Sequence, residues 1–178
     1  MSHWSCTALL LGVVMVSLAA CGSSEQAGKA AEANGPSKVD LYFVGRGTAY
    51  NIDAAAFAQL AQTKATDSAV RDLAMRISQT DSSIDRQLAA LAQTEGLSVP
   101  SSMDEQHQAR FAQLQSMNGP AFNRAWLDEA LPDQTMAIQT FQAEADAGKY
   151  PPLHDLAQQS LPALLENLQA TQQLAMSR

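Results

Sequence analysis

The feature that most constrains this fold is a helical repeat of apolar residues between positions 70 and 91. Steps of three or four residues from Val70 meet apolar side chains at every position except one, which is Asp81. The series is Val70, Ala74, Ile77, Asp81, Ile84, Leu88 and Leu91. This spacing places the series on one face of an α-helix, and that face is expected to be buried. A buried carboxylate is costly unless it is paired, protonated or wet.

Similar patterning predicts an all-α fold, an up-down four-helix bundle with an extra short helix in its middle connection. The expected long helices cover residues 41–65, 67–96, 121–147 and 151–176. The stretch "LYFVGRGTAY" is interpreted as the frayed or kinked start of the first helix. Asp67 is the expected N-cap of the second helix, Gly96 its C-cap, and Ser102 the N-cap of the short helix. Kinks are expected at Pro132 and Pro162.

The N-terminus predicts a lipoprotein signal. An apolar run of about 14 residues, from Thr7 to Ala20, suits a signal peptide and is too short to cross a bilayer. It ends in Leu18-Ala19-Ala20-Cys21, which resembles a bacterial lipobox. Cleavage before Cys21 and acylation of that thiol are therefore expected. The alternative is an ordinary secretory signal with a chance cysteine.

This interpretation divides the chain into residues 1–20 as signal peptide, 21–38 as lipidated cysteine and flexible tether, and 39–178 as the bundle domain. Acyl chains on Cys21 would hold the protein at a membrane without a spanning helix. Gly22 after the cysteine resembles an outer-membrane address, on the periplasmic face of a Gram-negative envelope. The net charge of -7, with no basic run, argues against a nucleic-acid partner. An envelope protein is the expected partner.

Two further helices repeat the polar interruption near their middles. Gln134, preceded by Asp133, lies between Ala130 and Ala137, and Asn167 lies at the edge of the apolar stripe of the last helix. Together with Asp81, these residues are expected to be partnered, partly wet, or the remnant of a site.

From Phe43 to about Leu174 the chain resembles the bacterial envelope family called domain of unknown function 4142. The resemblance rests on "LAMRISQTDSSIDRQLAALAQTEGLSVP", "MNGPAFNRAWLDEALPDQTMAIQTFQ" and "SLPALLENLQATQQL". It implies a ferritin-like four-helix bundle. The family usually has histidine where this chain has Asp81, Gln134 and Asn167, and often has glutamate where this chain has Ala54. The resemblance therefore implies an inward-facing ligand site that has been dismantled.

Residues for enzyme chemistry are few. Residues 22–178 contain no cysteine and no Gly-x-Ser-x-Gly elbow. His107 and His154 are interpreted as solvated surface imidazoles. Asp128, Glu129 and Asp133 are interpreted as a solvated face, and the scattered methionines as core filler.

Two functions remain open. The first is a non-catalytic, membrane-tethered bundle that acts by contact, as an envelope structural or stress-associated protein without a cofactor. The alternative is a divergent ferritin-like bundle that binds a divalent metal ion through oxygen ligands of Asp81, Asp133, Gln134 and Asn167, which would favour hard cations.

Overall fold

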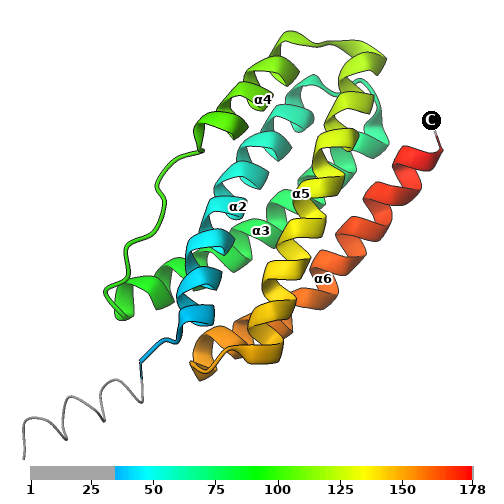
Figure 1. Ribbon diagram of the computed structural model, residues 1–178. Coiled ribbons are helices and arrows are strands. Elements are labelled where there is room, and N and C mark those ends of the chain that lie inside the picture. Colours follow the sequence, from blue (N-terminus) through cyan, green and yellow to red (C-terminus); the bar gives the residue numbers. More distant parts are fainter. Residues whose placement is uncertain (1–34, 178) are drawn as a thin grey trace, which may run out of the picture. The chain divides into compact units, whose positions relative to one another are not determined.

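A computed structural model describes residues 35–177, and in these residues the chain forms five α-helices (Figure 1). They are α2 (Lys38–Lys64), α3 (Ser68–Thr94), α4 (Glu105–Ser116), α5 (Gly119–Ala147) and α6 (Pro151–Met176). The long helices α2, α3, α5 and α6 form a four-helix bundle, and α4 is the extra short helix in the middle connection. The predicted all-α four-helix bundle with a short helix in its middle connection is confirmed. Among the helices of the described residues, none is both long and apolar enough to cross a membrane.

The helices run up, down, down and up rather than in strict alternation. Trp126 near the start of α5 donates to the carbonyl oxygen of Phe57 in the second half of α2. At the other end of the bundle, Phe141 meets Phe43 edge-on, with ring centroids 4.8 Å apart. Helix α5 is therefore antiparallel to α2. The α3–α5 connection, which contains α4, carries the chain back along the bundle. As a result, α3 and α5 run parallel (Figure 1).

Side-chain caps fix the starts of three helices. The Ser37 hydroxyl and the Asp40 carboxylate form a capping box, so α2 starts firmly at Lys38 instead of fraying. Asp67 accepts from the Ala69 amide and caps α3, as predicted. The predicted cap at Ser102 is wrong: Asp104 accepts from the His107 amide at 2.9 Å and caps α4. An aspartate directly before the first helical residue has the geometry that an N-cap needs.

The end of α3 follows the sequence prediction closely. Helix α3 ends at Thr94, and Gly96 follows with φ +64°, a conformation that glycine adopts without steric cost. Helices α5 and α6 are continuous through Pro132 and Pro162, so the expected kinks stay predictions.

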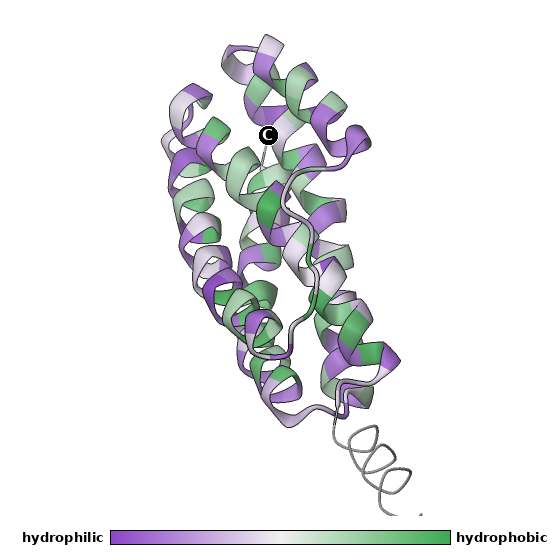
Figure 2. Ribbon diagram, turned by 90° about the vertical axis from the view of Figure 1, so that its left-hand side faces the viewer, coloured by the Kyte–Doolittle hydropathy of each residue, from purple (hydrophilic) through white to green (hydrophobic). Residues whose placement is uncertain are grey.

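Two hydrophobic clusters fill the bundle, one toward each end. We call them the Trp126 cluster, which includes Phe57, Val70, Ile77 and Phe122, and the Phe141 cluster, which includes Phe43, Ile84, Leu88 and Leu164. Figure 2 shows the underlying pattern, in which hydrophobic and hydrophilic residues alternate in bands along the helices. Each long helix contributes to both clusters, so the apolar core is divided near the middle of the bundle.

Not all methionines fill this core. Met103 and Met117 pack against the Trp126 cluster, but Met75, Met136 and Met176 are exposed. The prediction of core filler holds for the first two and is wrong for the other three.

Candidate functional site

A polar layer separates the two hydrophobic clusters. Asp81, Gln134 and Asn167, which the sequence singled out, are 1%, 5% and 3% exposed. Each lies along its helix between residues of the Trp126 cluster and residues of the Phe141 cluster. The prediction that these residues face the interior is therefore confirmed.

Asn51 of α2 is a fourth member of the polar layer that the sequence reasoning missed. Its side chain is 2% exposed and lies along α2 between Val44 of the Phe141 cluster and Phe57 of the Trp126 cluster. Each long helix thus contributes at least one buried polar side chain to the polar layer. The missed signal was the helical spacing from Phe43, Gly47 and Asn51 to Ala54 and Ala58.

Most polar side-chain atoms of the polar layer have no hydrogen-bond partner among residues 35–177. Both carboxylate oxygens of Asp81, both amide atoms of Asn51 and Gln134, and the amide nitrogen of Asn167 are buried without one. Burial raises the pKa of Asp81 to about 7, because the charged form loses its hydration. Buried polar atoms normally find protein or water partners. The layer therefore has unused capacity to bind water or an ion.

A small inner hollow lies against this layer. It has a volume of about 30 Å³ and is lined in part by Tyr50, Ala54, Asp133 and Gln134. Roughly 10–15 Å³ suffices for one water molecule, so the hollow has room for one or two. Ala54 and Gln134 are two of the positions where the resemblance implies metal-ligand side chains. In this chain the small side chain of Ala54 and the neutral side chain of Gln134 line the inner hollow.

Asp133 differs from the other predicted ligands. Its carboxylate lies 3.4 Å from the Arg110 guanidinium, which also binds Glu129 at 2.9 Å. Burial raises the pKa of Asp133, and the positive charge of Arg110 opposes that shift. The expected solvated acidic face is therefore wrong for Glu129 and Asp133, which hold α4 on α5, whereas Asp128 is exposed.

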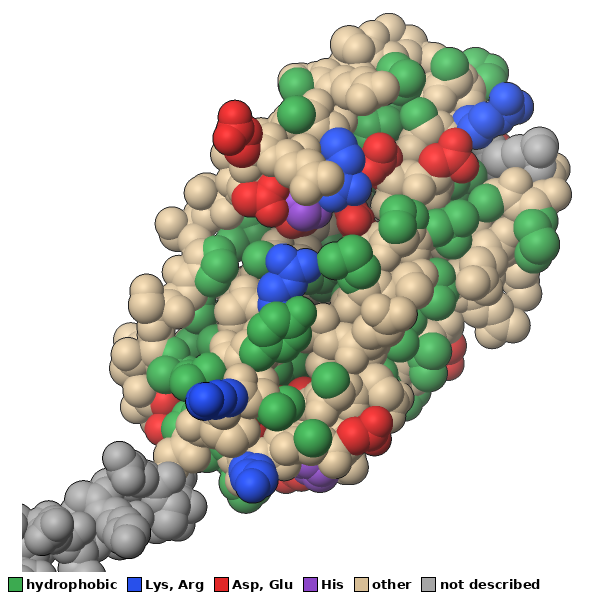
Figure 3. Space-filling view, in the orientation of Figure 1, with side chains coloured by type: hydrophobic (Ala, Val, Ile, Leu, Met, Phe, Trp, Pro, Cys, Tyr) green, Lys and Arg blue, Asp and Glu red, His purple; other side chains and the backbone are tan. Residues whose placement is uncertain are grey.

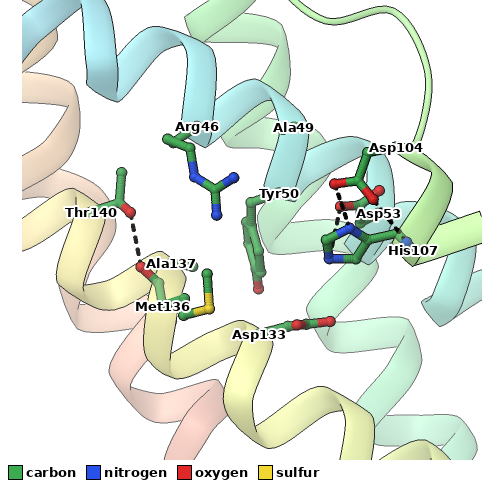
Figure 4. A pocket seen from close by; sticks show the side chains of 10 residues that line it. All are labelled: Arg46, Ala49, Tyr50, Asp53, Asp104, His107, Asp133, Met136, Ala137 and Thr140. Atoms are coloured by element: carbon green, nitrogen blue, oxygen red, sulfur yellow. Dashed lines mark hydrogen bonds and ion pairs between the residues drawn. The ribbon is translucent and has the colours of Figure 1, made fainter. Parts of the chain in front are cut away.

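An outer hollow, also of about 30 Å³, lies between α2, α4 and α5. Figure 4 shows its lining, with Arg46, Tyr50 and Asp53 from α2, Asp104 and His107 from the start of α4, and Asp133 from α5. Tyr50 and Asp133 line both hollows, so they stand between the outer hollow and the inner one. On the face seen in Figure 3, acidic side chains and a histidine gather beside α4.

His107 is the centre of the outer hollow. Its ring contacts Asp104 through Nδ1 at 2.9 Å and Asp53 through Nε2 at 3.4 Å, and only 16% of its side chain is exposed. The interpretation of His107 as a solvated imidazole is therefore wrong, because α4 folds back onto α2 and covers the ring. His154 does lie at the surface, beside the exposed carboxylate of Asp155.

Asp53 has an unusual environment for a carboxylate. Burial raises its pKa to about 6, although the charges of His107 and Arg110 oppose the shift. One of its oxygens, Oδ1, is buried and has no hydrogen-bond partner in the described part of the chain. Within residues 35–177, no three His, Cys, Asp or Glu side chains already lie close enough together to hold a metal ion.

A second buried acidic pair lies at the opposite end of α2. Asp40 accepts hydrogen bonds from the amides of Lys149 and Tyr150, both at 3.0 Å. Burial opposes ionisation of Asp40, but hydrogen bonds from Ser37, Glu144 and Tyr150 outweigh it and lower the pKa to about 2. Burial and the neighbouring Asp40 raise the pKa of Glu144 to about 8. Glu144 of α5 is therefore favoured in its protonated form beside ionised Asp40, and the bonds from the Lys149 and Tyr150 amides to Asp40 tie α2 to the α5–α6 turn.

Comparison with known proteins identifies the family but no activity. The model of the DUF4142 family, a domain of unknown function, matches residues 25–174. Among curated proteins, no sequence matches the chain.

Two solved structures share the fold. A DUF305 fragment from Deinococcus radiodurans has a TM-score of 0.72 and 17% identity, over 81% of this chain and 99% of that chain. A DUF305 protein from Streptomyces coelicolor that is described as secreted has a TM-score of 0.65 and 13% identity, over 75% of this chain and 88% of that chain. At these identities the similarity is one of fold.

Proposed function

We propose that this chain, which belongs to the DUF4142 family, is a lipid-anchored protein of the bacterial envelope that acts by binding another envelope component rather than by catalysis. The observation that carries this proposal is the sequence Leu18-Ala19-Ala20-Cys21 placed a short distance before the folded domain. Gly22 favours the periplasmic face of the outer membrane. The description of the Streptomyces coelicolor neighbour as secreted supports a site outside the cytoplasm.

The shape of the candidate site supports a non-catalytic role. The inner and outer hollows each measure about 30 Å³, which suits water or a single ion and excludes an organic substrate. The unpartnered side chains of the polar layer are buried inside the bundle, where a dissolved substrate does not reach them. The residues left for function are then those of the surface.

Labelling with a palmitate analogue tests the anchor. The full chain, expressed in a Gram-negative host, is expected to incorporate the label and to fractionate with the outer membrane. A Cys21→Ser variant is expected to lose the label, and a Gly22→Asp variant to keep the label but move to the inner membrane. An unlabelled wild-type protein, or equal labelling of the Cys21→Ser variant, would contradict the lipid anchor.

Crosslinking in intact cells tests action by contact. A photoreactive residue is placed at the exposed position Leu165 of α6. The lipidated protein that carries it is expected to form one discrete crosslinked product with an envelope partner. The same residue in the Cys21→Ser background serves as the matched control, since loss of the anchor would lower the local concentration of an envelope partner. Identical products from both proteins, or none from either, would argue against a membrane-dependent contact.

A second candidate function is the binding of a divalent metal ion by Asp81, Asp133, Gln134 and Asn167. The observation that favours it is that both Asp81 oxygens are buried without a partner. Metal analysis of untagged protein tests it. A stoichiometric ion that is lost in Asp81→Ala would support this function, and wild-type protein free of metal after incubation with Mg²⁺, Ca²⁺ or Mn²⁺ would exclude it.

A further inference from the structure

The His107 ring is held in one orientation by Asp104. One oxygen of Asp104 accepts from the His107 amide at 2.9 Å and caps α4, and the other lies 2.9 Å from Nδ1 of the same residue. An ionised carboxylate only accepts, so Nδ1 carries the proton. Histidines that bind metals show this arrangement, because a carboxylate on one ring nitrogen presents the other nitrogen to the ion.

The other nitrogen of His107 faces an anion without a hydrogen bond. Nε2 lies 3.4 Å from Oδ2 of Asp53, beyond the usual range of about 2.7–3.2 Å. In a neutral ring, whose single proton Asp104 holds on Nδ1, Nε2 presents a lone pair toward this carboxylate, and the two repel each other. A positive charge between them, either a second proton or a metal ion, removes that repulsion.

Asp53 has the remaining properties of a ligand. Asp53 lines the outer hollow, its side chain is only 8% exposed, and its Oδ1 is buried without a partner among the described residues. Two ligands bound to one tetrahedral ion at about 2.0–2.1 Å are separated by roughly 3.3 Å. The observed distance of 3.4 Å between Nε2 and Oδ2 matches that separation.

We propose that His107 and Asp53 form a binding site for a divalent transition-metal ion of the Zn²⁺ class, with Asp104 as a positioning residue. The imidazole nitrogen selects such ions over Mg²⁺ and Ca²⁺, which prefer oxygen ligands alone. Water in the hollow completes the coordination, and Asp133 on the same lining is a further carboxylate once it leaves Arg110. The bound ion links α4 to α2. This site is distinct from the polar layer and does not depend on the lipid anchor.

Titration of the purified, untagged full chain in detergent with Zn²⁺, followed by calorimetry, tests the site. One ion per chain is expected. His107→Ala and Asp53→Asn are each expected to weaken binding at least tenfold, and Asp104→Asn by about 10–100-fold. Because the metal replaces a proton, affinity is expected to rise with pH between 6 and 8 in the wild type. A tenfold excess of Mg²⁺ should not compete.

Two variants outside the site serve as controls. His154→Ala removes the other histidine of the described residues, and Asp81→Asn alters the polar layer, so both are expected to bind Zn²⁺ as the wild type does. Circular dichroism confirms that each variant is folded. Absence of binding by the folded wild type, or unchanged affinity in His107→Ala, would overturn the site. Replacement by Co²⁺ gives a second readout, since a tetrahedral site with a histidine ligand has visible absorption bands that His107→Ala should abolish.

Discussion

At the scale of the residue, Asp81 is a buried carboxylate whose burial the sequence predicted. The apolar repeat placed it on a buried face, and the structure buries it without a hydrogen-bond partner. Burial raises its pKa to about 7, so its charged form is unfavourable inside the bundle. The residue therefore does not contribute to stability in the way that a paired carboxylate does.

Asp81→Leu is expected to leave the melting temperature at pH 7.5 unchanged or to raise it. Leucine removes an unpartnered polar group and joins the two hydrophobic clusters, and such replacements of buried charges are often neutral or stabilising. Thermal unfolding followed by circular dichroism measures the effect, with Asp81→Asn as the control that keeps a polar side chain. A clear drop for the leucine variant would show that Asp81 has a partner, such as water or an ion.

Gly148 is a second position where a single atom matters. A Cβ atom there would overlap Oε1 of Glu144, the α5 residue beside Asp40, and would lie 2.6 Å from the Glu144 carbonyl oxygen. Gly148→Ala is therefore expected to destabilise the fold by about 1–3 kcal/mol, measured by urea unfolding.

Gly45→Ala is the matched control for Gly148→Ala. A Cβ at Gly45 meets no atom within 4 Å, and alanine favours the helix, so stability is expected to rise by about 0.5–1 kcal/mol. Equal effects of the two substitutions would contradict the role assigned to the Glu144 contact.

At the scale of elements, the bundle is held by contacts that span the sequence. The Trp126 indole of α5 donates to the Phe57 carbonyl oxygen of α2 at 2.9 Å, across 69 residues. Helix α4 is fastened differently, by charged contacts of His107 and Arg110 and by edge-on packing of Phe111 against Phe57. The long helices therefore share an apolar interface, whereas α4 combines these polar contacts with apolar packing of Phe111 and Leu114 in the Trp126 cluster.

Trp126→Phe is expected to lower the free energy of unfolding by about 1–3 kcal/mol. The substitution removes the indole hydrogen bond and leaves a cavity in the core, because the Trp126 side chain is only 2% exposed. Chemical denaturation measures the change. Tyr42→Phe also alters an aromatic side chain, but at a position that is 58% exposed, and should change stability by less than about 0.5 kcal/mol. Similar losses in both variants would contradict the interface described here.

At the scale of the whole molecule, buried carboxylates make stability depend on pH. The pKa values of Asp81 and Glu144 are raised to about 7 and about 8 from ordinary values of 3.8 and 4.5. Each group stabilises the fold fully below its unfolded pKa and loses that contribution as pH rises through its folded pKa. Asp40 acts in the opposite sense, since its lowered pKa of about 2 removes stability only in strong acid.

We therefore expect the protein to be most stable near pH 4–5 and to lose stability steadily up to pH 8. The slope is at most about 1.4 kcal/mol per pH unit for each group. Urea unfolding at pH 5, 6, 7 and 8 measures it. The double variant Asp81→Asn, Glu144→Gln should show a flatter profile over the same range. A wild-type protein that is more stable at pH 8 than at pH 5 would show that these carboxylates are ionised in the fold.

The sequence by itself determined the helices, the family and the burial of Asp81, Gln134 and Asn167. The helices and the buried positions follow from the spacing of apolar residues along one helix, which is a local property of the sequence. The family follows instead from the resemblance of three segments. The fold class and the family membership are both confirmed.

Only the tertiary structure decided which side chains from different helices come together. The path of the α3–α5 connection, which contains α4, brings His107 to Asp53, and the packing of α5 against α2 brings Glu144 to Asp40. Nothing in the spacing of either pair indicates these contacts, because they depend on how the helices pack and on where a long connection returns to the bundle. The charge state of each buried carboxylate follows from the same packing, since burial and neighbouring groups set its pKa.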